Sequence, residues 1–361
     1  MSRDIIIQSH KGKYEVNFVH GWIKDLNARD IKDFIFLIDS NIAEIYKQDL
    51  EDILISSRCL IIDANEKNKS LERFPDYVSS LVELGVKRGN TLIAIGGGIT
   101  QDITCFLATT MMRGLPWVFY PTTLLAQADS CIGSKSSINS GGIKNILGTF
   151  TPPEKIILDV QVLKTLKDID IHSGIGEMIK VHAIDSPESF DQISSEFDEI
   201  ISDDNAMEKF IYASLLIKKK LIELDEFDMG PRNVMNYGHS FGHAIEAATD
   251  YTIPHGIAVT IGMDMANFVA SRLGVSKESH FIRMHEVLEK NSSLFRKVFI
   301  DSDLLLKAIA KDKKNTSSQL KLILPDDLGK ITIGLYDRSA ELDNAVKEYC
   351  NLFQVQASSK T

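Results

Sequence analysis

Short apolar runs alternate with helical patterns through the first 155 residues of this 361-residue chain, and this alternation restricts the fold most. It predicts an α/β domain whose sheet is mainly parallel, with a ligand crevice at the carboxyl ends of the strands. The runs are rich in β-branched residues and bounded by polar residues or glycine, as buried strands are. We predict strands at Ile5–Ile7, Phe34–Ile38, Leu60–Ile62, Leu92–Ile95, Trp117–Tyr120 and Lys155–Leu158.

From Leu163 onward the pattern becomes mostly helical, and Thr151-Pro-Pro153 marks the change. A chain of this length suits two domains. We therefore expect a Rossmann-like, mainly parallel α/β domain over residues 1–155, followed by a mostly α-helical domain over residues 156–361. Helices are predicted at Ile175–Ala183, Asn205–Leu224 and His239–Thr249, and a β-hairpin at Gln319–Leu324 and Lys330–Leu335.

Three glycines, Gly96 to Gly98, separate a predicted strand from a helix that begins at about Thr100. Bare backbone beside a positive helix terminus is the geometry that binds a pyrophosphate. The order differs from the usual Gly-x-Gly-x-x-Gly fingerprint, so a simple tight turn is the alternative interpretation.

Histidines gather unusually closely in a chain that has only nine of them. His239 and His243 stand four residues apart in a helical pattern and so project from one helix face. His255 follows, and Glu177 lies upstream in a Gly-Glu pair. Two histidines and one carboxylate with an open position are typical of catalytic zinc-type sites. Satisfied core or capping histidines are the alternative.

The stretch after Pro121 is dense in glycine and serine and contains Lys135 and Lys144. We expect a loop there, and its lysines suit an anionic group such as phosphate. A solvated surface loop is the alternative.

Composition excludes several classes of protein. The net charge of −10 argues against a nucleic-acid partner, which requires a basic surface. No apolar stretch approaches the ~20 residues of a membrane span, and the start lacks a signal-peptide core. The four cysteines lack metal-type or disulfide-type spacing, so we expect reduced thiols and a cytoplasmic protein.

Taken in order, several motifs resemble those of the 3-dehydroquinate synthases, members of the sugar phosphate cyclase family. Their joint order and spacing are specific, and weaker matches extend the resemblance over roughly residues 35–330. The motifs are Gly96-Gly-Gly-x-x-x-Asp102, Arg113-Gly, Pro121-Thr-Thr-Leu-Leu-Ala-Gln-x-Asp-Ser130, Lys144-Asn-x-x-Gly148, Gly174-x-x-Glu-x-x-Lys180, Asn236-x-Gly-His-x-x-Gly-His-Ala-Ile-Glu246 and His255-Gly.

The resemblance implies conversion of 3-deoxy-D-arabino-heptulosonate 7-phosphate, a phosphorylated sugar acid, to 3-dehydroquinate and phosphate. It implies transient oxidation by NAD, β-elimination of phosphate, reduction and an intramolecular aldol closure. NAD is then a regenerated cofactor, one divalent ion (zinc or cobalt) is needed, and the enzyme is a homodimer.

The resemblance also implies roles for individual residues. Glu177, His239 and His255 would bind the metal, while His243 faces the substrate. Lys218 and Arg232 would hold the substrate carboxylate, although Lys218 begins a lysine run that ordinarily marks a solvated helix face. The implied phosphate-binding residues are Lys135, Asn145, Lys314 and, from the neighbouring subunit, Arg113. The implied residues for orienting hydroxyls and moving protons are Asp129, Lys180, Asn236 and His243. The implied NAD contacts are Asp39, Glu66, Lys69, Gly97, Gly98, Ile99, Asp102, Thr122, Thr123, Lys144 and Thr165.

The chain departs from the usual family pattern at a few positions. Gln101 replaces a frequent glycine, Ser134 and Ser136 stand where glycine and threonine are usual, and Asp228 replaces a glutamate. A specialised cyclase for a related or amino-substituted sugar phosphate is therefore one alternative. An iron-type or glycerol-type alcohol dehydrogenase is another, but its ligand aspartate has a histidine four residues later, which Glu177 lacks. A catalytically silent scaffold protein would be expected to have lost a ligand.

Overall fold

The computed structural model describes residues 4–27, 31–311 and 319–358. The chain forms two compact units, one of residues 1–166 and 207–227, the other of residues 167–206 and 228–361. The first unit is therefore discontinuous in sequence, because most of helix α9 (Asp204–Leu224) returns to it. The single domain boundary that we expected after residue 155 does not include the return of residues 207–227 to the first unit.

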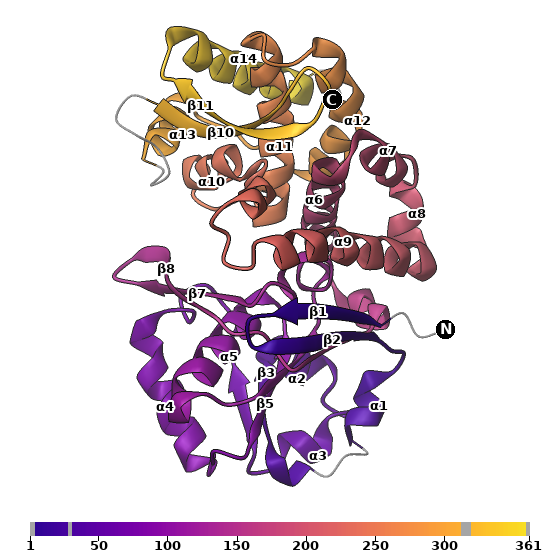
Figure 1. The fold of residues 1–361 in the computed structure, drawn as a ribbon, viewed down its shortest axis with the longest axis vertical. Coiled ribbons are helices and arrows are strands. Elements are labelled where there is room, and N and C mark those ends of the chain that lie inside the picture. Colours follow the sequence, from indigo (N-terminus) through magenta and orange to yellow (C-terminus); the bar gives the residue numbers. More distant parts are fainter. Residues whose placement is uncertain (1–3, 28–30, 312–318, 359–361) are drawn as a thin grey trace. The chain divides into compact units, whose positions relative to one another are not determined.

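A seven-stranded sheet in the order β1-β2-β9-β6-β5-β3-β4 forms the centre of the first unit (Figure 1). All neighbours pair in parallel except β1 and β2, which confirms the predicted mainly parallel sheet and all six predicted strands. The strands are β1 (Ile5–Ser9), β2 (Gly12–Phe18), β3 (Phe34–Asp39), β4 (Cys59–Ile62), β5 (Thr91–Gly96), β6 (Trp117–Pro121) and β9 (Lys155–Leu158).

The central strands are buried on both faces, as parallel strands covered by helices are. Phe36 and Ile38 of β3 pack with Ile93 and Ile95 of β5 in one apolar core. The chain passes from β3 outward to β4 and returns to β5 on the other side of β3. The connections after β3 and β5 therefore diverge, and such a switch point is where ligands bind in open α/β sheets.

The helices of this unit connect the strands, and a separate hairpin accompanies them. The stretch from Lys135, which we expected to be a loop, instead forms strands β7 (Lys135–Ser140) and β8 (Ile143–Phe150). Gly141 and Gly142 both have positive φ, as a tight hairpin turn requires, so that expectation was wrong. The helices are α1 (Trp22–Asn27), α2 (Ser40–Ile45), α3 (Glu51–Leu54), α4 (Phe74–Glu83), α5 (Gly98–Thr110), the short turns η1 (Ile31–Asp33), η2 (Leu71–Arg73), η3 (Met111–Arg113), η4 (Ala126–Ser130) and η5 (Val160–Thr165), and α9.

The second unit is mostly helical, as predicted, and is built around helix α11 (His255–Arg272). Every residue of α11 from Gly256 to Ala270 is buried, which makes it a central helix. The predicted hairpin is present as β10 (Gln319–Pro325) and β11 (Ile331–Asp337). Within the described ranges, no helix has the length and apolar character of a membrane span. The other elements are α6 (Asp168–Asp185), α7 (Pro187–Ser195), α8 (Phe197–Ser202), η6 (Pro231–Asn236), α10 (His239–Ala248), α12 (Glu278–Ser292), η7 (Ser293–Phe295), α13 (Ser302–Ala310) and α14 (Ala340–Ser358).

Candidate metal centre and cofactor site

Helices α6 and α11 approach each other so closely that glycine is required at their crossing. A Cβ atom on Gly256 would lie 1.9 Å from the Ser173 carbonyl oxygen, and one on Gly176 would lie 2.3 Å from the Gly256 carbonyl oxygen. Glu177 and His255 are the direct neighbours of these two glycines. The crossing therefore brings the carboxylate and the imidazole together.

Helix α10 approaches α11 in the same manner. A Cβ atom on Gly262 would lie 2.2 Å from the carbonyl oxygen of Gly238. Gly238 has a φ of 76° and immediately precedes His239, the first residue of α10. This second glycine contact brings His239 toward the residues carried by α6 and α11.

The side chains of Glu177, His239 and His255 lie at distances that suit one shared ion. Glu177 Oε1 is 3.8 Å from His239 Nε2 and 3.5 Å from His255 Nε2. Two ligands about 2.1 Å from a tetrahedral ion lie about 3.4 Å apart, so this donor set fits a divalent metal. His243 joins the cluster, because ligand atoms of the three histidines lie within 4.8 Å of one another.

Hydrogen bonds orient both imidazole rings. His239 Nδ1 lies 3.2 Å from the Tyr237 carbonyl oxygen, and His255 Nδ1 lies 3.2 Å from Glu246 Oε2. These acceptors favour a proton on Nδ1 and turn each Nε2 toward Glu177. Sequence reasoning did not assign a role to Glu246, although its position seven residues after His239 on one helix could have indicated it.

The surroundings shift the pKa values of the two imidazoles in opposite directions. Burial, Lys180 and the neighbouring histidines hold the pKa of His239 well below its usual value, so its ring is neutral, as ligation requires. Burial lowers the pKa of His255, but its hydrogen bond to Glu246 and the charge of Glu177 raise the pKa above its usual value overall. Lys180 forms an ion pair with Glu177 Oε2.

Two more predicted residues of this unit lie in η6. Arg232 is buried, with 4% of its surface exposed. Asn236 ends the same element and donates a hydrogen bond from Nδ2 to the Asn233 carbonyl oxygen at 3.0 Å. A buried guanidinium suits bidentate binding of a carboxylate.

In the first unit, Lys218 and Asp129 meet although 89 residues separate them in sequence. Lys218 Nζ lies 2.6 Å from Asp129 Oδ1 and also donates to the Asp129 carbonyl oxygen. Lys218 is buried, whereas Lys219 is partly exposed and Lys220 is exposed. The lysine run thus has one buried member, and it is the one that the resemblance selects.

The unusual Gln101 is explained by a contact with the segment that carries Asp129. Gln101 Nε2 donates to the Ser130 carbonyl oxygen at 2.7 Å, and Ser130 Oγ donates back to Gln101 Oε1 at 2.8 Å. This pair of hydrogen bonds fixes α5 against η4, a π-helical turn of the kind that often occurs at functional sites.

The glycine run lies at the switch point of the sheet. A Cβ atom on Gly96 would lie 3.1 Å from the Asp39 Cβ, and one on Gly97 would lie 2.9 Å from Thr123 Cγ2. The Thr122 amide donates to the Gly96 carbonyl oxygen at 2.9 Å. The first turn of α5, with Gly98 and Ile99, therefore starts beside three of the predicted cofactor residues.

Lys69 connects three other predicted residues. Its Nζ lies 3.3 Å from Asp102 Oδ2, 3.0 Å from Asn145 Oδ1 and 3.4 Å from Glu66 Oε1. Burial raises the pKa of Asp102 to about 6, although Lys69 and the Ser137 amide favour its ionised form. The amide of Asn139, which we had not singled out, donates to Glu66 Oε1 at 2.8 Å.

The remaining predicted residues are less enclosed. Lys135 and Lys144 are exposed on the β7–β8 hairpin, and Thr165 ends η5 with its hydroxyl bonded to the Val162 carbonyl oxygen. Arg113 is exposed in a turn where it and Met112 have φ values of 67° and 51°. Such left-handed backbone is strained for non-glycine residues. Lys314 lies outside the described residues.

Local hydrogen bonds also account for two serines that replace usual family residues. Ser134, with a φ of 66°, donates from Oγ to Glu226 Oε1 at 2.9 Å. Ser136 Oγ lies 2.7 Å from Thr149 Oγ1 across the β7–β8 pair. Nothing in the structure explains why Asp228 replaces glutamate.

Two family models together match most of the chain. Residues 59–173 match 3-dehydroquinate synthase N-terminal, and residues 174–315 match 3-dehydroquinate synthase C-terminal. The 3-dehydroquinate synthase of a Thermoanaerobacter species is 34% identical over 341 residues, which cover 91% of this chain and 96% of that protein. That of Dictyoglomus thermophilum is 37% identical over 311 residues, which cover 85% of this chain and 86% of that protein.

Solved structures of other enzymes share the fold. A 2-deoxy-scyllo-inosose synthase complexed with carbaglucose-6-phosphate, NAD+ and Co2+ has a TM-score of 0.82 at 21% identity, covering 96% of this chain and 99% of that one. The 2-epi-5-epi-valiolone synthase of Streptomyces hygroscopicus subsp. jinggangensis, with NAD+ and Zn2+ bound, has a TM-score of 0.82 at 24% identity, covering 94% and 97%. At these identities the likeness concerns the fold alone.

Proposed function

Because this chain belongs to the 3-dehydroquinate synthase family, we propose that it converts 3-deoxy-D-arabino-heptulosonate 7-phosphate to 3-dehydroquinate and phosphate. The observation that carries the proposal is the cluster of Glu177 with His239, His243 and His255, since its donor set suits a divalent ion. The chain would then be a carbon–oxygen lyase of the shikimate pathway to aromatic amino acids. Its four free cysteines agree with a place in the cytoplasm.

Glu177, His239 and His255 would hold the metal, with His243 turned to the substrate. Nitrogen and carboxylate ligands of this kind suit zinc or cobalt. When bound, the ion polarises adjacent hydroxyl groups of the sugar and acts as a template. The tight glycine crossings of α6, α10 and α11 preorganise the ligands before the ion arrives.

NAD would bind to the first unit at the switch point of the sheet. Asp39 would accept hydrogen bonds from the adenosine ribose, and the amides around Gly97 and Gly98 would hold the pyrophosphate. When bound, NAD supplies a reversible hydride acceptor and is regenerated in each turnover. Asp102 would support the cofactor through its contacts with Lys69 and the Ser137 amide.

The chain's cations would bind the two anionic ends of the substrate. Lys218 and Arg232, both buried, would bind its carboxylate, and this pair indicates a carboxylated sugar phosphate. Lys135, Asn145 and Lys314 would bind its phosphate. Arg113 would reach the phosphate site of a second copy, which makes a homodimer part of the proposal.

Proton handling would fall to four polar residues. Lys180 forms an ion pair with the Glu177 carboxylate, and Asp129 forms one with Lys218. His243 and Asn236 would orient substrate hydroxyls, and the His243 imidazole would help to move protons.

The test is an assay of purified protein with the heptulosonate phosphate, zinc and NAD at much less than one equivalent of substrate. We expect stoichiometric phosphate and dehydroquinate without net NADH. A matched heptulose phosphate that lacks the carboxylate should react poorly, and Arg232→Ala should remove most of that preference. Lysine at position 232 should restore little, because it lacks the planar fork.

The outcomes separate the alternatives. Phosphate release from only the carboxylate-free compound would indicate a specialised cyclase and refute the synthase assignment. Steady NADH accumulation would indicate an alcohol dehydrogenase. Absence of turnover with metal and NAD bound would indicate a protein without catalysis.

A further inference from the structure

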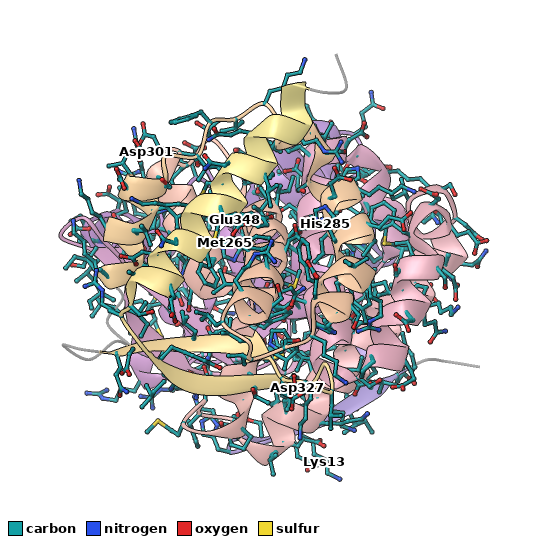
Figure 2. All side chains as sticks on the ribbon, turned by 90° about the horizontal axis from the view of Figure 1, so that it is seen from above. Lys13, Met265, His285, Asp301, Asp327 and Glu348 are labelled. Carbon is teal, nitrogen blue, oxygen red and sulfur yellow. The ribbon has the colours of Figure 1, made fainter. Side chains whose placement is uncertain are left out.

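The second unit contains a cavity of about 220 Å³ that none of the predicted site residues lines. Residues of α11, α12, α14 and the segment after η7 surround it. Figure 2 labels one residue on each of the three helices: Met265 on α11, His285 on α12 and Glu348 on α14. The cavity is smaller than the about 300–1,000 Å³ of sites for larger ligands, so it suits a compact molecule.

One wall of the cavity is polar and fixed by hydrogen bonds. Asp264, 4% exposed, accepts a hydrogen bond from the Tyr349 hydroxyl at 2.8 Å. His285 Nδ1 lies 2.8 Å from the same carboxylate. The carboxylate orients the imidazole ring, and its hydrogen bond raises the pKa of His285 above the usual value.

Arg296 supplies a buried donor that lacks an acceptor. Its Nη2 pairs with Glu289 Oε1 at 2.5 Å, but its Nε–H has no hydrogen-bond partner among the described residues. Buried donors in native proteins almost always have a partner, so such a group indicates a molecule that supplies one. A carboxylate oxygen is a strong, charge-assisted acceptor for a guanidinium.

Aromatic rings make up much of the remaining wall. Phe281 lies 4.9 Å from the His285 ring, and Tyr349 lies 6.5 Å from Phe353, measured between ring centroids. Aromatic walls favour a planar ring between them. The two acidic residues of the lining, Asp264 and Glu289, pair with His285 and Arg296 respectively. The cavity therefore accommodates a monoanion better than a dianion.

We propose that this cavity binds a small aromatic carboxylate, with its ring against Phe281 and Tyr349 and a carboxylate oxygen accepting the Arg296 Nε–H. The site is separate from the histidine cluster, so binding requires no metal. The proposal is also independent of the function proposed above, because it uses none of the same residues.

Benzoate is the probe, measured by titration calorimetry with the full chain and by a crystal structure of the complex. We expect saturable binding that is equal in metal-loaded and chelator-treated protein, and at least tenfold weaker binding of the neutral isostere benzamide. Arg296→Gln should weaken benzoate binding at least tenfold. Arg283→Gln removes a cation of α12 that pairs with Asp191, and it should leave binding within twofold.

Two further variants locate the site independently of Arg296. Leu352 lines the cavity and is 41% exposed, so Leu352→Trp should fill the cavity and abolish binding without disturbing the core. Arg232→Ala should leave benzoate binding unchanged. Loss of binding in Arg232→Ala together with retention in Leu352→Trp would overturn the proposal, as would a cavity that contains only water at saturating benzoate.

Discussion

Replacing Gly256 with alanine tests directly how helix packing positions the metal ligands. The added Cβ would lie 1.9 Å from the Ser173 carbonyl oxygen and 2.7 Å from the Ser173 carbonyl carbon, both backbone atoms that cannot rotate away. Ordinary contact begins near 3.4 Å, so α6 and α11 must separate by roughly 1.5 Å. Overpacking of this kind costs about 1–3 kcal/mol, occasionally more.

The same displacement acts on the metal site, because Glu177 and His255 adjoin the crossing. We expect about a 10–100-fold loss of zinc affinity, the range seen when ligand orientation is lost. Turnover at saturating zinc should fall by on the order of 10²-fold, since 1 Å of misplacement has that effect. Urea unfolding, zinc competition titration and phosphate release measure the three quantities.

The control is Gly89→Ala, at an exposed position where an added Cβ meets no described heavy atom within 4 Å. It should change the free energy of unfolding by less than about 0.5 kcal/mol and leave zinc affinity intact. If Gly256→Ala matches this control in zinc affinity, the glycine crossing does not position the ligands and our reasoning fails.

Three further predictions concern single side chains. Lys218→Ala should lower kcat/KM for the carboxylated substrate by about thirtyfold or more, whereas the exposed Lys220→Ala should change it less than about twofold; equal effects would refute the assignment of the buried lysine. Tyr237→Phe removes the hydroxyl that lies 2.5 Å from Asn267 Oδ1, so the free energy of unfolding in urea should fall by about 1–3 kcal/mol. Zinc content should persist, because the backbone carbonyl at position 237 still orients His239. Burial lowers the pKa of His280 to about 4, so between pH 6.5 and pH 4 the unfolded chain binds a proton that the folded chain does not. The free energy of unfolding should therefore fall by up to about 3 kcal/mol as the pH falls from 6.5 toward 4. His280→Leu should flatten this pH dependence in urea unfolding, and an unchanged slope would contradict the burial argument.

The sequence predicted the parts of the fold whose signal is local. Central strands such as β3 and β5 are continuous apolar runs because both of their faces are buried. Strand β2, Gly-Lys-Tyr-Glu-Val-Asn-Phe, alternates with charged residues, since only one face of it packs on the core, and it was missed. The β7–β8 hairpin was missed because its serines and glycines are typical of a loop.

For the candidate site, the residue types were predictable but their contacts were not. Because His239 and His243 are four residues apart, helix geometry alone predicts that they share one helix face. The contact between Lys218 and Asp129 spans 89 residues, and no periodicity in either segment indicates it. The glycines that bring Glu177 to His255 belong to two different helices, so their close approach became visible only when the helices were packed.

The contacts of Gln101 and Ser134, two residues that differ from the usual family pattern, indicate whether these differences affect the choice of substrate. Gln101 and Ser130 exchange two hydrogen bonds within the first unit, and Ser134 is held by Glu226, which also accepts from the Ser9 hydroxyl at 2.6 Å. These side chains are therefore engaged in fixing backbone segments. A change of substrate would instead require a change at a cation or ligand, and Lys218 remains buried and paired. The proposal of a carboxylated substrate therefore rests on Lys218 and Arg232, and the substitutions at positions 101 and 134 replace neither residue.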